Sequence, residues 1–147
     1  MKKRIRIMVF GTFDVLHKGH LHFFMQAQKL SSNTFLIVSL ARDENVKAIK
    51  GRQPLFKLRD RMAAVKKTGL AQRVVAGALK NYLGHIVHEK PDIIALGYDQ
   101  SEYIDGLLEK LKKRGLHVRI FRLKPYKPHV YKSSLVKRRL PKSMRIS

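Results

Sequence analysis

Segments typical of β-strands alternate with segments of helical periodicity along almost the whole chain. Short apolar or alternating runs typical of strands occupy residues 4–10, 34–40, 73–76, 93–96 and 117–123. Apolar residues recur at helical spacing over residues 19–30, 55–69, 82–89, 101–114 and 133–140. Such alternation predicts a parallel sheet with helices on both faces. We therefore expect an α/β protein, namely a single-domain, Rossmann-like, doubly wound sheet of five strands.

The 147 residues suit one compact domain and leave no room for a second full core. We place the domain at residues 1–140 and interpret residues 141–147, which begin with Pro141, as a basic C-terminal tail. The polar residues 41–54 are expected to form a loop or a short irregular helix.

Two helix ends carry local signals. Gly69 is well placed as the left-handed residue that ends the helix over residues 55–69. Ser101 is expected to cap the helix over residues 101–114, with acidic residues in its first turn and basic residues in its last turn. That order of charges suits the helix dipole.

Positive charge dominates the composition. The chain has 32 Lys and Arg residues against 10 Asp and Glu residues, a formal net charge of +22, and no acidic residue follows Glu109. Such a field attracts polyanions, including nucleic acid, anionic membranes and phosphate-rich small molecules, but it does not choose among them. An anionic ligand is therefore expected.

Several classes of protein are excluded or disfavoured. The chain has no cysteine, which excludes disulfides, thiolate catalysis and cysteine-ligated zinc or iron–sulfur sites. No apolar run approaches the roughly 20 residues needed to cross a bilayer. The first ten residues are too interrupted by charge for a signal peptide. We expect a soluble cytoplasmic protein with no membrane partner.

Ligands of doubly wound sheets bind beyond the carboxyl ends of the strands. The first strand is followed by the sequence GTFDVLHKGH, in which His17 and His20 flank Gly19 at the start of a predicted helix. Two imidazoles beside the N–H groups of a helix start could bind a phosphate. The alternatives are a pair of surface histidines and a zinc site, but only Asp14 is a nearby third ligand, so no protein-bound metal is expected.

The whole segment resembles the signature of the HxGH nucleotidylyltransferase superfamily. Further matches to that superfamily lie along residues 4–140, in the same order. They are Ala41-Arg42-Asp43-Glu44 with Lys47 and Lys50-Gly51-Arg52, Arg59 near the start of a helix, Leu96-Gly97-Tyr98-Asp99-Gln100, and Ser133-Ser134 at the last helix.

The resemblance implies transfer of a nucleoside monophosphate from a nucleoside triphosphate to a phosphorylated acceptor, with release of pyrophosphate. The implied catalytic residues are His17, His20 and Lys50. The nucleotide would be bound by both histidines and by Gly11, Thr12, Phe13, Gly97, Asp99, Ser133 and Ser134. The acceptor would be bound by Asp14, Lys47 and Arg59. Mg²⁺ or another divalent cation would travel with the triphosphate, and a homodimer is expected.

The acceptor is assigned by finer resemblance. The run typical of glycerol-phosphate cytidylyltransferases is missing at residues 127–132, whereas Leu96–Gln100 and the bare Ser133-Ser134 pair resemble archaeal-type FAD synthases. The resemblance therefore favours adenylyl transfer from ATP to FMN.

Two alternatives stay open. One is transfer from CTP to glycerol 3-phosphate or a similar phospho-alcohol. The other is a basic nucleic-acid-binding module, although no RNP-type signature is present. The histidines outside the signature match no motif and are interpreted as structural or surface residues: His22, His85, His88, His117 and His129.

Overall fold

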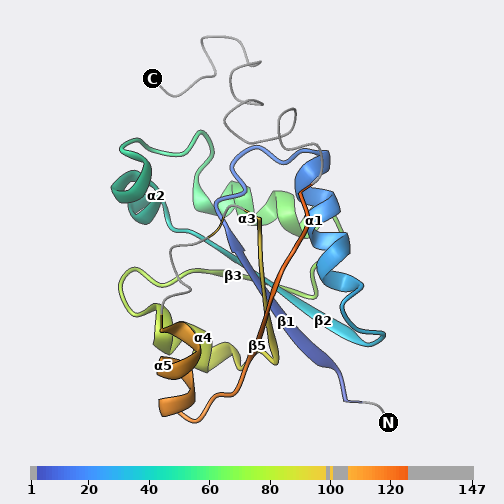
Figure 1. The fold of residues 1–147 in the computed structure, drawn as a ribbon. Helices are drawn as coiled ribbons and strands as arrows, with labels where there is room; N and C mark the ends of the chain where they lie inside the picture. Colours follow the sequence, from blue (N-terminus) through green and yellow to red (C-terminus); the bar gives the residue numbers. More distant parts are fainter. Residues whose placement is uncertain (1–2, 99, 101–105, 126–147) are drawn as a thin grey trace.

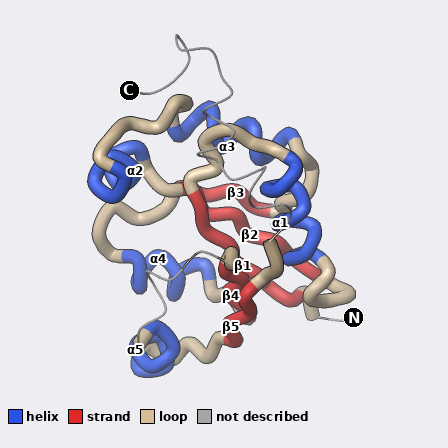
Figure 2. The backbone as a smooth tube through the Cα atoms, turned by 45° about the horizontal axis from the view of Figure 1, so that its top comes forward, coloured by secondary structure: helices blue, strands red, loops and turns tan. Residues whose placement is uncertain are grey.

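Five parallel strands form the centre of the computed structural model, which describes residues 3–98, 100 and 106–125. The strands are β1 (Ile5–Gly11), β2 (Thr34–Leu40), β3 (Arg73–Ala76), β4 (Ile93–Leu96) and β5 (Arg119–Arg122). Figure 1 draws the sheet as a ribbon, and Figure 2 labels the strands in their order across it, β3-β2-β1-β4-β5. The chain moves outward from β1 to β3 and then returns to β4, so the strand order reverses between β1 and β4. The predicted α/β class is confirmed.

Helices cover both faces of the sheet (Figure 2). They are α1 (Lys18–Gln28), α2 (Asp43–Lys50), α3 (Leu58–Lys67), α4 (Tyr82–Glu89) and α5 (Leu107–Lys113). One core cluster joins α1 and α3 to the sheet through Phe24 and Val65, and the other joins α4 and α5 through Ile86 and Leu111. In the described part of the chain, no helix is both long and apolar enough to cross a bilayer.

The inner strand β2 explains why the sheet is covered on both faces. Its residues Leu36, Ile37 and Val38 are fully buried and point alternately to the two faces. Burying each such side chain contributes about 1.5–3 kcal/mol. A strand that is apolar on both faces is stable only when helices lie on both.

The polar segment over residues 41–54, expected as a loop or short irregular helix, contains the regular helix α2. Asp43 and Glu44 lie in its first turn and Lys47 and Lys50 in its last turn, an order that suits the helix dipole. Gly51 ends the helix at φ 75°. The apolar pattern is weak because Val46 is the only buried residue of the helix.

The boundaries of other helices and strands differ slightly from the predicted ones. The helix expected to begin near Leu55 begins at Leu58, and Gly69 has the predicted positive φ, 70°. The fifth strand is shorter than expected, and α5 starts only at Leu107, after Gly106 in the left-handed conformation. The predicted Ser101 cap, the helix over residues 133–140 and the basic tail lie outside the described residues.

A buried carboxylate fixes α4 against the sheet. Glu89, at the end of α4, is 4% exposed and accepts two hydrogen bonds from Arg73 of β3, at 2.7 and 3.0 Å. The guanidinium of Arg6 on β1 lies 3.7 Å from the same carboxylate and donates from Nε to the backbone oxygen of Glu89. The hydrogen bonds from Arg73 lower the pKa of Glu89. This network sets the position of α4, which borders the site.

Candidate active site

A cavity of about 310 Å³ lies beyond the carboxyl ends of β1, β2 and β4, the edge predicted to hold ligands. Its walls come from the strand ends, the loop after β1, α2, α4 and the start of α5. The lining combines polar side chains with apolar ones, which include Ile86, Ile94 and Leu96. The polar lining residues used below are Thr12, His20, Ser39, Asn45, Lys50, Tyr82, His85 and Gln100.

The two histidines of the signature cap α1 together. Nδ1 of His17 accepts a hydrogen bond from the backbone N–H of Gly19 at 3.0 Å, and Nδ1 of His20 accepts one from the backbone N–H of His17 at 3.3 Å. The rings stack, with their centroids 3.8 Å apart and an angle of 25° between their planes. A capping box made of two imidazoles therefore fixes both side chains at the start of a helix that borders the cavity.

These contacts determine the protonation of both rings. A ring nitrogen that accepts a hydrogen bond carries no proton, so each neutral imidazole carries its proton on Nε2. Burial lowers the pKa of His20 to about 3, and repulsion from His17 and Lys50 acts in the same direction. Burial also lowers the pKa of His17. Both rings are thus neutral hydrogen-bond donors at neutral pH.

The depressed pKa of His20 predicts that the free energy of unfolding falls as the pH is lowered. The unfolded chain takes up a proton near the ordinary value of 6.5, whereas the folded chain does so only near 3. Stability from this group is therefore complete above about pH 6.5 and is lost towards pH 3, at up to about 1.4 kcal/mol per pH unit. Urea unfolding at several pH values should give a shallower dependence for His20→Asn. Equal slopes for both proteins would contradict the prediction.

Phe13 places His20. Its ring is buried, meets the His20 ring edge-on at 5.4 Å, and packs 5.1 Å from Phe24 of α1. The residue has a positive φ of 49°, and its ring lies so close over Gly11 that a Cβ there would come within 2.6 Å of it. Gly11 is therefore required for packing, because any side chain would displace the ring that supports His20.

Arg61 is the largest fully buried side chain and was not singled out by sequence. Its guanidinium donates to the backbone oxygens of Thr12, Ala41 and Phe56 at 2.8–2.9 Å, and to the carboxylate of Asp43 at 2.6 Å. One cation thus joins the loops after β1 and β2, the start of α2 and the loop before α3. These segments carry the predicted signature and the lysine-bearing helix.

The predicted acceptor residues are not among those that line the cavity. Asp14 is buried and accepts hydrogen bonds from the backbone nitrogens of Leu55 and Phe56 at 2.6 and 2.8 Å, so it holds the loop before α3. Lys47 and Arg59 are exposed and do not line the cavity. Lys50, from the last turn of α2, does line it.

On the other side of β1, the segment after β4 is held by its own side chains. The Gln100 amide accepts from the backbone nitrogen of Gly97 at 2.8 Å and donates to the oxygen of Phe10 at 2.8 Å. Arg122 of β5 donates to the oxygens of Gly97 and Gln100. Gln100 lines the cavity, whereas Gly97, to which it is hydrogen bonded, is not among the lining residues. Asp99, Ser133 and Ser134 lie outside the described residues.

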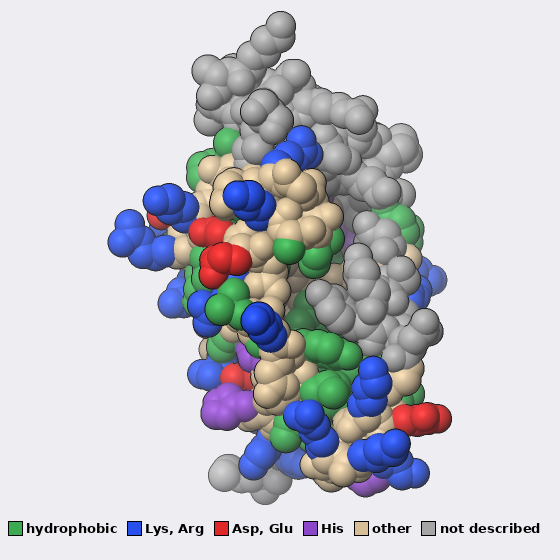
Figure 3. All heavy atoms as spheres, turned by 90° about the vertical axis from the view of Figure 1, so that its left-hand side faces the viewer, with side chains coloured by type: hydrophobic (Ala, Val, Ile, Leu, Met, Phe, Trp, Pro, Cys, Tyr) green, Lys and Arg blue, Asp and Glu red, His purple; other side chains and the backbone are tan. Residues whose placement is uncertain are grey.

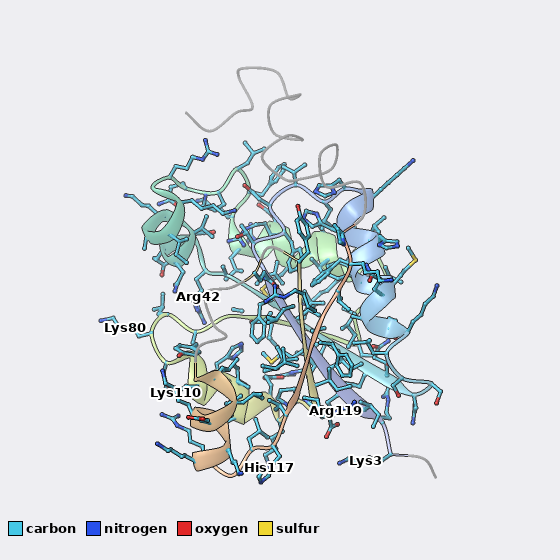
Figure 4. The ribbon with its side chains drawn as sticks, viewed as in Figure 1. Lys3, Arg42, Lys80, Lys110, His117 and Arg119 are labelled. Carbon is cyan, nitrogen blue, oxygen red and sulfur yellow. The ribbon has the colours of Figure 1, made fainter. Side chains whose placement is uncertain are left out.

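Positive charge extends well beyond the cavity. In Figure 4, Arg42 and Lys80 lie on the left-hand side, whereas Lys3, His117 and Arg119 lie at the lower end, where β1 and β5 begin. Figure 3 shows Lys and Arg side chains spread over a whole face, around hydrophobic ones. The basic surface alone therefore does not locate the site, whereas the cavity and the histidine pair do.

Comparison with known proteins agrees with this geometry. The model of the cytidylyltransferase-like family matches residues 8–139. The chain belongs to this family. A protein named FAD synthase from Thermococcus sibiricus is 38% identical over 137 residues, covering 92% of this chain and 88% of the relative. Another, from Pyrococcus horikoshii, is 40% identical over 136 residues, with the same coverage. The predicted resemblance is confirmed.

A solved relative has the same fold. The crystal structure described as the lipopolysaccharide core biosynthesis protein from Thermoplasma volcanium GSS1 has a TM-score of 0.78 and 34% sequence identity. The match covers 85% of this chain and all of that one. The cytidylyltransferase-like fold thus accounts for the order of the strands.

Nucleotidyltransferases of the FAD synthase group generally use a divalent cation. Within residues 3–98, 100 and 106–125, no three His, Asp or Glu side chains gather so that they could hold a metal ion. The cavity instead offers imidazole, lysine and hydroxyl groups, which suit phosphate oxygens.

Proposed function

We propose that the protein transfers the AMP group of ATP to FMN, forming FAD and pyrophosphate. Support comes from the FAD synthase relatives, which match over 92% of this chain. The observation that carries the proposal is the stacked pair of neutral imidazoles at the start of α1, beside a cavity that Lys50 also lines. These groups suit a reaction in which negative charge develops on phosphate oxygens.

The chemistry requires positioning more than proton transfer. An oxygen of the FMN phosphate attacks the α-phosphorus of ATP, and the bond from that phosphorus to the bridging oxygen breaks. The electron pair leaves with pyrophosphate, so atoms and charges balance without a base. The protein must hold attacking and leaving oxygens in line and donate hydrogen bonds to the oxygens that gain charge.

Neutral histidines suit this task. Because the Nδ1 atoms accept from backbone N–H groups at the start of α1, each neutral ring carries its proton on Nε2, which would donate to an α-phosphoryl oxygen. A neutral ring donates without first taking up a proton, and the helix start adds a favourable dipole. Lys50, which lines the cavity, would supply positive charge for the leaving pyrophosphate.

The remaining roles follow the family pattern. Gly11, Thr12 and Phe13 would contact the nucleotide through the loop after β1. On the β4 side, the nucleoside would be held by Gly97 and Asp99, and the phosphates by Ser133 and Ser134. Lys47 and Arg59 would attract the acceptor, and Asp14 would hold the loop beside it. Mg²⁺ is the proposed cation, bound by phosphate oxygens, and a homodimer is the proposed assembly.

A pyrophosphate-release screen tests the proposal. ATP and CTP are each combined with FMN, glycerol 3-phosphate, phosphocholine and phosphopantetheine, with and without Mg²⁺. Release with ATP and FMN, well above every other pair, is expected. Release only with CTP and a phospho-alcohol would instead identify a cytidylyltransferase and reject FMN as the acceptor.

Lys50→Ala should lower kcat by about tenfold to a hundredfold. Its free energy of unfolding should stay within about 0.5 kcal/mol of that of the unmodified protein, because an exposed lysine adds little to the core. The exposed Lys66 on α3 does not line the cavity, so Lys66→Ala is the matched control for lost charge. Steady-state kinetics and urea unfolding measure both effects. Equal losses of activity in the two variants would show that only overall charge matters.

A further inference from the structure

Ser39 interrupts the apolar run of β2, and its side chain borders the cavity. The residue is 2% exposed, and its Oγ lies 2.9 Å from Nε2 of His85 on α4. Burying a hydroxyl costs free energy unless it is hydrogen bonded. A Ser–His pair joining β2 to α4 therefore forms a buried polar point in a strand whose neighbouring residues, Val38 and Leu40, are apolar.

Three further residues from α2, the β3–α4 loop and α4 line the same cavity. Asn45 of α2 donates to the backbone oxygen of Leu79, which fixes its amide beside the β3–α4 loop. Tyr82, in the first turn of α4, lines the same wall. A Cβ at Gly77 would lie 3.1 Å from the oxygen of Leu40 and 3.6 Å from Ser39 Oγ, so the glycine keeps the wall open there.

We call Ser39, Asn45, Tyr82 and His85 the floor cluster. Next to it, the cavity is lined by the apolar side chains of Ile86, Ile94, Leu96 and Leu107. An apolar wall with one polar group of donors and acceptors suits a flat aromatic ring that has one polar edge. The floor cluster thus suits a ring, whereas His20 and Lys50 suit phosphate groups.

The order of the strands indicates which substrate ring the floor cluster binds. The histidine pair follows β1, at the point where the strand order reverses, so the reacting phosphates lie between two sides of the sheet. Gly97, proposed for the nucleoside, lies on the β4 side. The floor cluster lies on the β2 side. In-line attack requires the acceptor oxygen to lie opposite the leaving pyrophosphate, and a nucleoside on the β4 side leaves the β2 side for the ring of the acceptor.

Resting on the proposed function, we infer that the floor cluster binds the ring of the flavin acceptor, with the Ser39–His85 pair hydrogen bonded to the polar edge of its pyrimidine portion. That edge alternates carbonyl acceptors with an N–H donor. A neutral histidine bonded to a serine can present either a donor or an acceptor, depending on which of the two partners donates. The pair can therefore match either kind of group.

The charges around His85 support a neutral ring. Burial lowers the pKa of His85, and the positive charges of His88, Arg42 and Arg73 act in the same direction, while Glu89 opposes them. The carboxylate of Glu89 is itself engaged by Arg73.

Direct binding separates the ring site from the phosphate site. FMN, riboflavin and ATP are titrated separately into the full chain, using flavin fluorescence for the first two. Riboflavin carries the same ring without a phosphate. The variants are Ser39→Ala, His85→Ala and the more conservative His85→Gln, with thermal unfolding checking that each folds. His88→Ala, an exposed histidine on the same helix outside the cavity wall, is the matched control, and Lys50→Ala reports on the phosphate site.

Ser39→Ala and His85→Ala should each weaken the binding of FMN and of riboflavin by about tenfold, the effect of losing one buried hydrogen bond. The affinity for ATP should change by less than about twofold. Lys50→Ala should weaken the binding of FMN or ATP without changing the binding of riboflavin. Weakened ATP binding with unchanged FMN would assign the floor cluster to the nucleotide and overturn the inference. Unchanged binding in every variant would also overturn it, leaving a structural role. If the unmodified protein binds no flavin, the proposed function itself fails.

Discussion

His20→Ala should lower kcat for FAD formation by about a hundredfold or more. The variant loses an Nε2–H donor that is already neutral, oriented by the backbone N–H of His17 and supported by the Phe13 ring. A donor aimed at developing charge typically contributes a factor of about 10²–10³ to turnover. His17→Ala should have a similar effect, because its ring stacks on His20 and caps the same helix.

The control for this prediction is His117→Ala, since His117 is exposed near the start of β5, far from the cavity edge (Figure 4). Its turnover should stay within about twofold of the unmodified protein. Circular dichroism and riboflavin binding should be retained by His20→Ala, because the ring site does not use this side chain. Near-normal turnover in both signature variants would remove the histidines from the mechanism.

Arg61→Ala should lower the free energy of unfolding by about 3–5 kcal/mol. The change leaves a cavity, and it leaves three backbone carbonyls and the Asp43 carboxylate without the donor that now joins them. Arg61→Lys should recover little of the lost stability. An ammonium cannot reproduce the planar fork that reaches partners in three loops and at the start of α2. Urea unfolding measures both variants.

Arg59→Ala is a matched comparison for stability, because Arg59 lies two residues away on the same helix and is exposed. Its free energy of unfolding should change by less than about 0.5 kcal/mol. If Arg61→Ala proved equally mild, the guanidinium would not be holding the loops after β1 and β2 together.

The contrast between these two arginines shows what sequence reasoning missed. The family pattern directed attention to Arg59. Helical spacing places Arg61 with Leu58, Met62 and Val65, the apolar stripe of α3, so periodicity marks it as a buried cation. A charged residue on an apolar stripe is rare unless it is paired, and that was the available signal.

Other elements were predictable for clear reasons. The boundaries predicted for β2, β3, β4 and α4 agree with the structure because strong apolar runs and Lys90-Pro91 mark them locally. The sequence predicted a loop or a short irregular helix there, because α2 is short and mostly polar and offers only Val46 and Ile49 as large apolar residues at helical spacing. In hindsight its charge order and Gly51 mark both of its ends.

The floor cluster could not be predicted because it forms only in the fold. Ser39 and His85 are 46 residues apart and meet through packing of α4 on the sheet. His85 was interpreted as a structural or surface residue, yet it lines the cavity. A serine within a buried apolar strand was the only local hint, and it named no partner.

Transfer of a radioactive phosphorus from ATP tests the central claim most directly. The protein is incubated with FMN and ATP labelled at either the α- or the γ-phosphorus, and the flavin and pyrophosphate products are separated. Label from the α position should appear in FAD, and label from the γ position should appear only in pyrophosphate. Label from the γ position in the flavin, or no labelled flavin with either ATP, would contradict adenylyl transfer to FMN.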